Sequence, residues 1–172
     1  LYTLSKEGHL DRQELLDLSV ESMTFEFDSL QLGGFGAFHR GLDPTDDEIK
    51  AREQRYRNLL SHKIGSIAKY GFEMLLHLQK AGRLDTKAFL TEIPVIFQQP
   101  AKGTATKVLK LIDRICKQQP ALRSESISAF IEALNHRHVD VQKWAFAFLD
   151  RYKEELSSAD KTRILEIGDY VS

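Results

Sequence analysis

Five basic side chains form the group in this sequence whose type and spacing best suit ligand binding. The group, called the basic stripe below, consists of Lys102, Lys107, Lys110, Arg114 and Lys117. Spacings of three and four residues place the last four on one face of a helix. Such a face could follow a phosphate backbone, which Lys and Arg neutralise. An ordinary solvated helix face has the same pattern, and a net charge of −1 provides no general attraction to nucleic acid.

Two histidines and an aspartate lie close enough in the sequence to suggest a metal site. His136 and His138 precede Asp140, and ligands two residues apart in a loop can share an ion. A zinc site needs three or four protein ligands, and no second group of candidate ligands lies nearby in the sequence. We therefore predict a solvated turn at this point, with no metal and no cofactor.

The segment Gly33-Gly34-Phe35-Gly36 has the glycine content of a loop that surrounds a phosphate group. Loops of that kind follow a strand and continue with Lys and Ser or Thr, and neither feature is present here. The sequence favours a break between helices, with the aromatic side chains docked beside it.

The pair Asp113-Arg114 recurs as Asp150-Arg151. Recurrence favours ion pairs and packing between repeats, because active sites rarely occur once in every repeat. Trp144 is expected to pack beside the core. No catalytic residue is predicted. Whether the protein is an enzyme stays open, and a non-catalytic protein is favoured.

The elements that position these residues are predicted to be helices, from the periodicity of the apolar side chains. Apolar side chains recur at spacings of three and four, and no segment alternates with a period of two, so the predicted fold is all-α. Thr45 and Glu48 form a capping box, and Asp11 is a further candidate N-cap. Pro94 predicts either a bend or a first helical turn that begins later than Asp85 or Thr86. The other candidate caps are Ser124 or Ser126 and Ser157 or Ser158. The helices are expected near residues 10–27, 45–60, 64–81, 85–97, 104–116, 127–134, 140–152 and 164–171.

The apolar pattern returns with an offset of 37 residues. The aligned columns of the second helices are Phe72, Leu109 and Phe146; Leu75, Ile112 and Leu149; and Leu78, Ile115 and Tyr152. Helix pairs of this kind bury their second apolar face on a neighbouring pair, which predicts an α-solenoid of antiparallel helix pairs with these columns buried. Its expected parts are an irregular segment at 1–45, repeats at about 46–82, 83–120 and 121–156, and an incomplete repeat at 157–172. A chance match within an ordinary helical bundle is the alternative.

Composition adds broad limits. The chain has 172 residues, of which 42% are hydrophobic and 28% charged, as in folded globular proteins. Its single cysteine, Cys116, cannot form an internal disulfide, which favours a reducing, cytoplasmic setting and a core position. No apolar run approaches the ~20 residues of a membrane helix. The sequence begins with Leu1 rather than Met, so residues 1–172 are expected to be one segment of a longer chain.

The last complete repeat shows the clearest family likeness. Asp140-Val141-Gln142-Lys143, followed by Ala145 and Leu149, resembles the second helix of a HEAT repeat. The run FHRGLDPT at residues 38–45, with segments 82–90 and 109–114, is similar to an uncharacterised family of large bacterial HEAT-like proteins. The resemblance covers most of the chain. It implies fold and bacterial origin, and transfers no activity and no site residue.

Three functions are compatible with these patterns. The first is a non-catalytic helical-repeat scaffold that binds a protein or peptide, because solenoids expose extended surfaces without needing a catalytic pocket. The second is a nucleic-acid-binding HEAT-like domain that uses the basic stripe, with or without the glycosylase activity of some HEAT-like proteins. The third is a purely structural segment of a larger protein. None of them involves a membrane.

Overall fold

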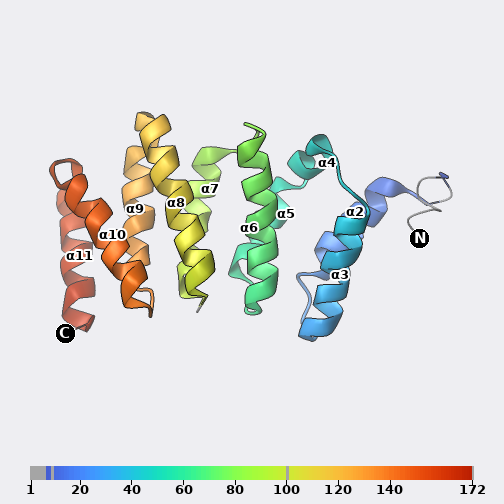
Figure 1. The fold of residues 1–172 in the computed structure, drawn as a ribbon, viewed down its shortest axis with the longest axis horizontal. Coiled ribbons are helices and arrows are strands. Elements are labelled where there is room, and N and C mark those ends of the chain that lie inside the picture. The colour runs from blue at the N-terminus through green and yellow to red at the C-terminus, as the bar shows by residue number, and fades with distance from the viewer. Residues whose placement is uncertain (1–6, 9, 100, 172) are drawn as a thin grey trace. The chain divides into compact units, whose positions relative to one another are not determined.

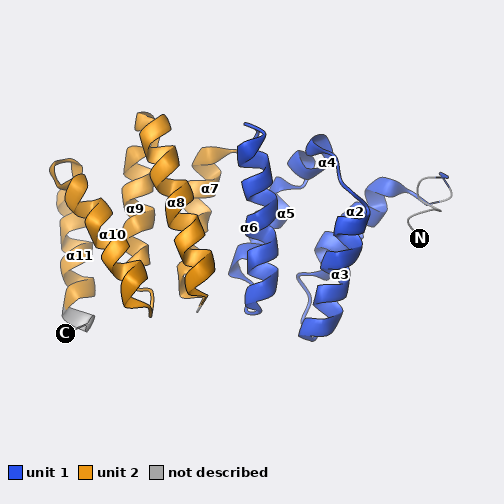
Figure 2. Cartoon of the chain, viewed as in Figure 1, with its two compact units in different colours: residues 1–84 blue, residues 85–172 orange. Residues whose placement is uncertain are grey.

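The computed structural model describes residues 7–8, 10–99 and 101–171, with side chains as far as Gly168. All regular structure in these residues is helical, so the predicted all-α class is confirmed. The chain divides into two compact units, unit 1 at residues 1–84 and unit 2 at residues 85–172 (Figure 2). None of the described helices combines the length and the apolar character that crossing a membrane requires.

Unit 1 consists of two helix pairs. Its elements are α2 (Arg12–Ser22), α3 (Ser29–Gly41), α4 (Asp46–Ala51), α5 (Glu53–Asn58), the 3₁₀ turn η1 (Leu59–Ser61) and α6 (Gly65–Lys80) (Figure 1). Helix α2 packs on α3, and α6 packs on α4, α5 and η1. The pairs also contact each other, through α2 with α5 and α3 with α6. The segment predicted to be irregular therefore contains a regular helix pair.

Local signals explain where the helices of unit 1 begin. The Asp11 carboxylate accepts hydrogen bonds from the backbone N–H groups of Gln13 and Glu14, as predicted. The capping box of Thr45 and Glu48 is also confirmed, with both of its hydrogen bonds formed. Asp28, which was not predicted as a cap, forms a further capping box at the start of α3. These caps satisfy N–H groups that the first turn leaves unpaired.

The predicted helix break at Gly33, Gly34 and Gly36 is wrong. Helix α3 runs through all three glycines, and the break lies before it, at residues 23–28. Glycine lowers helix propensity by about 1 kcal/mol relative to alanine. Burial of Leu32 and His39 on the inner side of α3 offsets that cost, because tertiary packing rather than propensity supplies most helix stability.

Unit 2 repeats the paired arrangement. Its elements are α7 (Thr86–Glu92), η2 (Ile93–Gln98), α8 (Lys102–Gln118), η3 (Pro120–Leu122), α9 (Arg123–Ala133), α10 (Val139–Arg151), η4 (Lys153–Glu155) and α11 (Ser158–Val171). Helix α9 contacts α7 and α11, while α8 contacts α10. Figure 1 shows α8 and α10 side by side with α9 behind them, so unit 2 has two layers of helices.

Several helix ends in unit 2 differ from the prediction. Pro94 lies in the first turn of η2, where the chain changes from α to 3₁₀ geometry, so a new first turn begins there within the segment that was expected to be one helix. Helix α9 begins at Arg123 and has no side-chain cap; Ser126 lies inside it and donates to the Leu122 carbonyl. The predicted cap at Ser157 is confirmed, but α11 starts directly after it, six residues before the expected start.

The predicted core of unit 2 is largely confirmed. Leu109, Ile112 and Leu149 are buried. Phe146 is 61% exposed, so its predicted burial is wrong. The reason is that Phe146 lies in a recess between α10 and α11, where Leu134, Ile164 and Ile167 line the same space without covering it completely. The buried aromatic ring of α10 is instead that of Phe148.

Ion pairs in both units join residues that lie 37 or 38 positions apart in the sequence. In unit 1, Glu26 pairs with Lys63 across 37 residues. In unit 2, Asp113 pairs with Arg151 across 38 residues, with 2.9 Å between the charged atoms. The predicted ion pairing of the recurring Asp-Arg dipeptides is thus confirmed for Asp113 with Arg151. The separations agree with the offset read from the apolar columns.

Candidate functional site

An apolar recess of unit 1 lies between α2 and α3. This α2–α3 groove has a volume of about 500 Å³. Its lining side chains, mostly apolar, are Leu15, Leu18, Ser19, Ser22, Phe27, Gln31, Phe35 and Phe38, and Gly34 completes the lining. The opposite sides of both helices carry the buried core residues of unit 1. The groove therefore uses a second apolar face on each helix, directed away from the core.

Large apolar side chains at this groove remain exposed. Leu18 is 51% exposed and Phe27 is 40% exposed. The Phe27 ring lies 5.9 Å from the Phe25 ring and 5.8 Å from the Phe35 ring, measured between centroids. A cluster of this kind is unusual on the surface of a monomeric soluble protein and is typical of an interaction site.

Gly34 leaves the centre of the groove open. A Cβ atom built at Gly34 would have no other atom within 4 Å, and the same is true of Gly33. No close approach within the chain therefore requires glycine at these two positions. Glycine here leaves the backbone of α3 accessible and deepens the groove, at the cost in helix propensity noted above.

The surroundings of the groove are acidic. Residues 1–48 contain eleven acidic and three basic residues. Several carboxylates pair with cations of the neighbouring helices, including Asp17 with Arg52 and Glu48 with Arg12. The Arg12 hydrogen bond is the main cause that lowers the pKa of Glu48 to about 2. These acids stabilise unit 1 and are not available to a partner.

Three further carboxylates near the groove stay exposed. Helical spacing places Asp11 one turn before Leu15, and Glu14 one turn before Leu18. Asp28 adjoins Phe27 at the start of α3. No cation of the described residues lies within 4.0 Å of any of these three carboxylates. The rim of the groove is thus negatively charged.

A buried polar network supports the groove from behind. Ser19, which lines the groove, lies with its Oγ 2.7 Å from His39 Nδ1, and His39 Nε2 lies 2.8 Å from the Tyr56 hydroxyl. The Ser19 hydroxyl donates to the Leu16 carbonyl, so His39 Nδ1–H must donate to Ser19 and Tyr56 must donate to Nε2. Burial, reinforced by Arg52 and Arg40, lowers the pKa of His39 to about 4. With a neutral His39 ring, the side chains of Ser19, His39 and Tyr56 all have hydrogen-bond partners.

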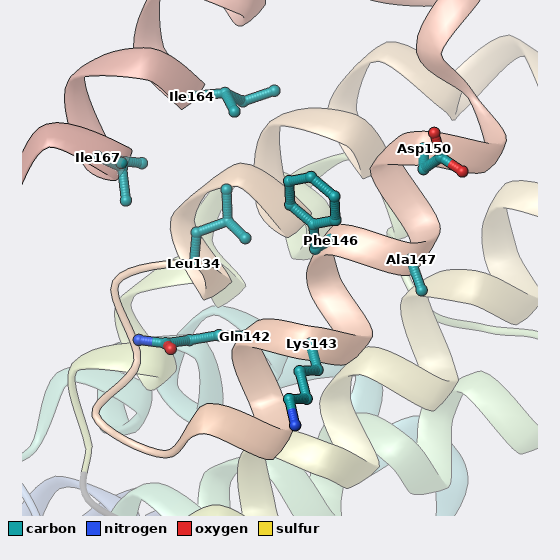
Figure 3. Close-up of a pocket in the computed structure, with 9 residues that line it drawn as sticks. Leu134, Gln142, Lys143, Phe146, Ala147, Asp150, Ile164 and Ile167 are labelled. Carbon is teal, nitrogen blue, oxygen red and sulfur yellow. The ribbon is translucent and has the colours of Figure 1, made fainter. Parts of the chain in front are cut away.

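Unit 2 has its own apolar recess, the α10–α11 groove, with a volume of about 420 Å³. Phe146 projects into it from α10, opposite Ile164 and Ile167 of α11 (Figure 3). Lys143 and Asp150 lie near opposite ends, since they are seven residues apart on α10. This recess has balanced charge, in contrast to the acidic α2–α3 groove.

The structure places the basic stripe on the solvent-facing side of α8. All five side chains are exposed, but two are neutralised: Lys102 pairs with Asp140, and Lys117 pairs with Asp113 at 2.6 Å. The Lys110 ammonium lies 5.9 Å from the centre of the Trp144 ring. No carboxylate of the described residues lies within 4.0 Å of Lys107, Lys110 or Arg114. The positive charges of these three side chains are therefore available to an anionic ligand.

The predicted solvated turn near His136 is wrong for His136 itself, which is buried. Its Nδ1 accepts a hydrogen bond from the His138 N–H, and its backbone carbonyl accepts one from the Gln142 side chain. His62, which lies before α6, accepts from the Ile64 N–H in the same way. Each imidazole thus fixes the turn before the helix that follows it, α6 for His62 and α10 for His136. No group of three or more potential metal ligands occurs among the described residues.

Comparison with known families supplies one match. The family model described as a domain of unknown function (DUF6493) matches residues 1–103. The chain belongs to this family. No curated protein and no solved structure matches the chain. The DUF6493 match contains all of unit 1, including the α2–α3 groove, whereas four residues of the basic stripe and the α10–α11 groove lie beyond it.

The sequence prediction placed one helix at residues 10–27 and a glycine break after it, so it did not reveal the α2–α3 groove. The sequence feature that could have revealed the groove was the large number of apolar residues at 15–38. Leu15, Leu18 and Ser22 share one face of α2, while Leu16, Val20 and Met23 share another. A helix with two apolar faces has more apolar surface than one core contact can bury.

Proposed function

We propose that this chain is a non-catalytic, HEAT-like helical-repeat scaffold that binds a protein partner. Two features of both units support a repeat scaffold: helices of the same layer contact one another, and ion pairs join residues one repeat apart. The binding site is the α2–α3 groove of unit 1. Its occupant is an amphipathic helix with apolar anchors and basic flanks.

The exposed aromatic groove is the observation that carries the proposal. Covering apolar surface contributes roughly 25 cal/mol for each Å² removed from water. Leu18, Phe27 and Phe35 present such surface in one recess, and Phe25 extends it. A helix that places side chains at i, i+3, i+4 and i+7 fits between two antiparallel helices, because those side chains form one continuous ridge.

The charge of the rim indicates the polarity of the partner. Asp11, Glu14 and Asp28 surround the groove without cations of the described chain beside them. A partner helix with Lys or Arg beside its apolar ridge would gain favourable contacts and a faster association rate, while an acidic helix would be repelled. The charge of the rim therefore favours a basic partner.

Selection from a displayed library of helical peptides tests the proposal while the partner is still unidentified. The library holds apolar residues at helical spacing and varies the flanking positions among Lys, Arg, Glu, Asp, Ser and Gln. Enriched peptides should carry a net positive charge. They should bind the Leu18→Glu variant at least about tenfold more weakly, which corresponds to about 1.4 kcal/mol.

Leu165→Glu is the matched control, since Leu165 is an exposed leucine of α11 in unit 2. It should leave peptide binding unchanged. The proposal is wrong if enriched peptides are acidic, or if Leu18→Glu and Leu165→Glu bind them equally. Circular dichroism of both variants should match that of the original chain, since both leucines are on the surface.

A second function, nucleic-acid binding, is favoured by the three uncompensated cations of the basic stripe. Lys107, Lys110 and Arg114 follow one face of α8, with Trp144 beside Lys110. Retention on duplex DNA at low salt should then fall steeply as salt rises, because each neutralised phosphate releases counterions. Lys107→Glu with Lys110→Glu should abolish retention, and Lys153→Glu with Lys161→Glu should not. Absence of retention at low salt would exclude this function.

A further inference from the structure

The α10–α11 groove of unit 2 is apolar, partly open and not used by the function proposed above. Phe146 of α10 is largely exposed in it, opposite the half-buried side chains of Ile164 and Ile167 of α11 (Figure 3). Gly168 completes the α11 side of the groove, and a Cβ atom there would have no other atom within 4 Å. A further helix could therefore approach α11 closely and cover the Phe146 ring.

Opposite charges mark the two ends of the α10 side of this groove. One exposed face of α10 carries, at spacings of three, four and seven residues, Lys143, Phe146, Ala147 and Asp150. Seven residues of helix separate the two charged residues by about 10 Å along the axis. The face thus has a positive end, an apolar middle and a negative end (Figure 3).

Neither of the two charges is strongly paired within the chain. No carboxylate of the described residues lies within 4.0 Å of the Lys143 ammonium. Asp150 contacts Lys153 at 3.9 Å, and both side chains are well exposed, so solvent weakens this contact. Lys143 and Asp150 are therefore available to a molecule that lies along the groove.

The order of the two charges indicates which partner fits. A strongly acidic or strongly basic helix would gain a contact at one end of the groove and meet a like charge at the other end. A helix with the opposite order of charges would gain contacts at both ends. The same face of α10 has this opposite order when the helix is turned end to end, so the groove is complementary to a second copy of itself. The acidic rim of the α2–α3 groove, in contrast, would repel its own copy.

We propose that two copies of the chain pair through their α10–α11 grooves, with the two α10 helices antiparallel about a twofold axis. The axis passes between Phe146 and Ala147. Lys143 of each copy then lies opposite Asp150 of the other copy, because a twofold interface exchanges the same two positions. Each Phe146 ring lies against Ala147 of the other copy, so a large side chain meets a small one and the helices can interdigitate.

The pairing is expected to be weak and limited to two copies. Two helices from each copy make a small interface, which corresponds to a dissociation constant of roughly 10–100 µM. The net charge of −1 adds little repulsion between copies. Below about 1 µM the chain is then a monomer with Phe146 exposed, and stability measured in that range is that of the monomer. The pairing involves unit 2 and does not depend on peptide docking in unit 1.

Sedimentation velocity of the chain at concentrations from about 1 µM to about 300 µM tests the pairing. The weight-average mass should rise from that of the monomer toward twice that value and then level off, because a twofold interface closes on itself. A monomer mass over the whole range would overturn the proposal, and so would continued growth beyond the dimer.

Charge reversal separates antiparallel pairing of α10 from general apolar association. Lys143→Glu places two carboxylates together at each end of the pair, and Asp150→Lys places two ammonium groups together. Each variant alone should dimerise at least about tenfold more weakly than the original chain. Lys80→Glu, an exposed control on α6, should change nothing.

An equimolar mixture of Lys143→Glu and Asp150→Lys should pair about as strongly as the original chain. In the mixed dimer both ends again bring opposite charges together, and recovery of pairing also shows that both variants are folded. If the single variants dimerise as the original chain does, or if their mixture stays monomeric, the assignment is wrong.

Discussion

The two units share one arrangement of paired helices but differ in what their cores contain. In unit 1, Ser19, His39 and Tyr56 form a buried hydrogen-bonded chain that links α2, α3 and α5. In unit 2, the corresponding interior is apolar, and Phe130 and Phe148 stack with their ring centroids 3.6 Å apart. Packing specifies the α9–α10 interface of unit 2, whereas the interior between α2, α3 and α5 of unit 1 also requires a neutral His39.

This difference matches the surfaces of the two units. The polar core of unit 1 lies directly behind the α2–α3 groove, because Ser19 belongs to both. A buried network that is completely bonded holds its members in one arrangement, but a protonation change leaves some of them unsatisfied. We infer that the groove is held in shape by hydrogen bonds, while the α10–α11 groove rests on an apolar layer.

Substitution of phenylalanines on α10 should produce the largest effect. Phe148→Ala should lower the free energy of unfolding by about 3–5 kcal/mol, because it leaves a cavity beside Phe130. Phe146→Ala, two residues away and exposed, should change it by no more than about 0.5 kcal/mol. Urea denaturation of both variants measures the difference. Similar losses would show that Phe146 is buried in solution and that the α10–α11 groove is covered.

Acid should destabilise unit 1 through His39. The folded pKa is about 4, below the ordinary value of about 6.5 expected in the unfolded chain. Between these values the unfolded chain binds a proton that the folded protein does not, so stability is complete above about pH 6.5 and falls as the pH decreases. The slope is about 1.4 kcal/mol per pH unit, and the total is roughly 3 kcal/mol.

His39→Gln isolates this contribution, since a glutamine amide can bond to Ser19 and Tyr56 but does not titrate. Burial also lowers the pKa of His136 in unit 2, so His136→Gln is the matched comparison. The free energy of unfolding is measured at pH 7 and pH 5 for both variants and for the original chain. The decrease between these pH values should become smaller in both variants, and the reduction should be larger in His39→Gln than in His136→Gln. If that variant retained the slope of the original chain, the pH dependence would arise elsewhere.

Features of the fold that depend on neighbouring residues in the chain could be predicted from the sequence. The caps at Asp11 and Thr45 are examples, because each is formed with backbone or side-chain groups within three residues. The exposed face of the basic stripe is another, since it follows from helical spacing. The pairing of Lys102 with Asp140 was not foreseen, because it joins residues 38 apart in the sequence.

Features that depend on packing in three dimensions could not be predicted. Helical periodicity identifies Phe146 as apolar but does not show whether another helix covers it. His39 has no local pattern, since its partners come from α2 and α5. The α2–α3 groove was hidden for the same reason: Leu18 and Phe27 differ from core residues only in what lies opposite them.

Glycine substitutions in unit 1 should have opposite signs. A Cβ atom at Gly71 of α6 would lie 2.6 Å from the Tyr56 carbonyl oxygen, so Gly71→Ala should cost about 1–3 kcal/mol of stability. Gly34→Ala meets no atom and should raise stability by up to about 1 kcal/mol. It should also weaken binding of the selected peptides, because the new methyl group enters the groove.

Thermal unfolding and peptide binding, measured on the same samples, check both results. Gly33→Ala controls for helix propensity, since Gly33 is equally open but does not line the α2–α3 groove. It should stabilise the chain as Gly34→Ala does and leave peptide binding unchanged. Weaker binding in both variants would mean that stiffening of α3, rather than occupation of the groove, impairs docking.

The ion pairs between residues 37 or 38 positions apart should give the smallest effect, and the two units should differ. Asp113 is partly buried and contacts both Arg151 and Lys117, so Arg151→Gln should cost about 0.5 kcal/mol at low salt. Glu26 and Lys63 are well exposed, and Lys63→Gln should have no measurable effect. Added salt should reduce the difference, because it screens the exposed side of the Asp113 pair. If urea denaturation showed the same loss of unfolding free energy in Arg151→Gln and Lys63→Gln, burial of Asp113 would not strengthen its ion pair.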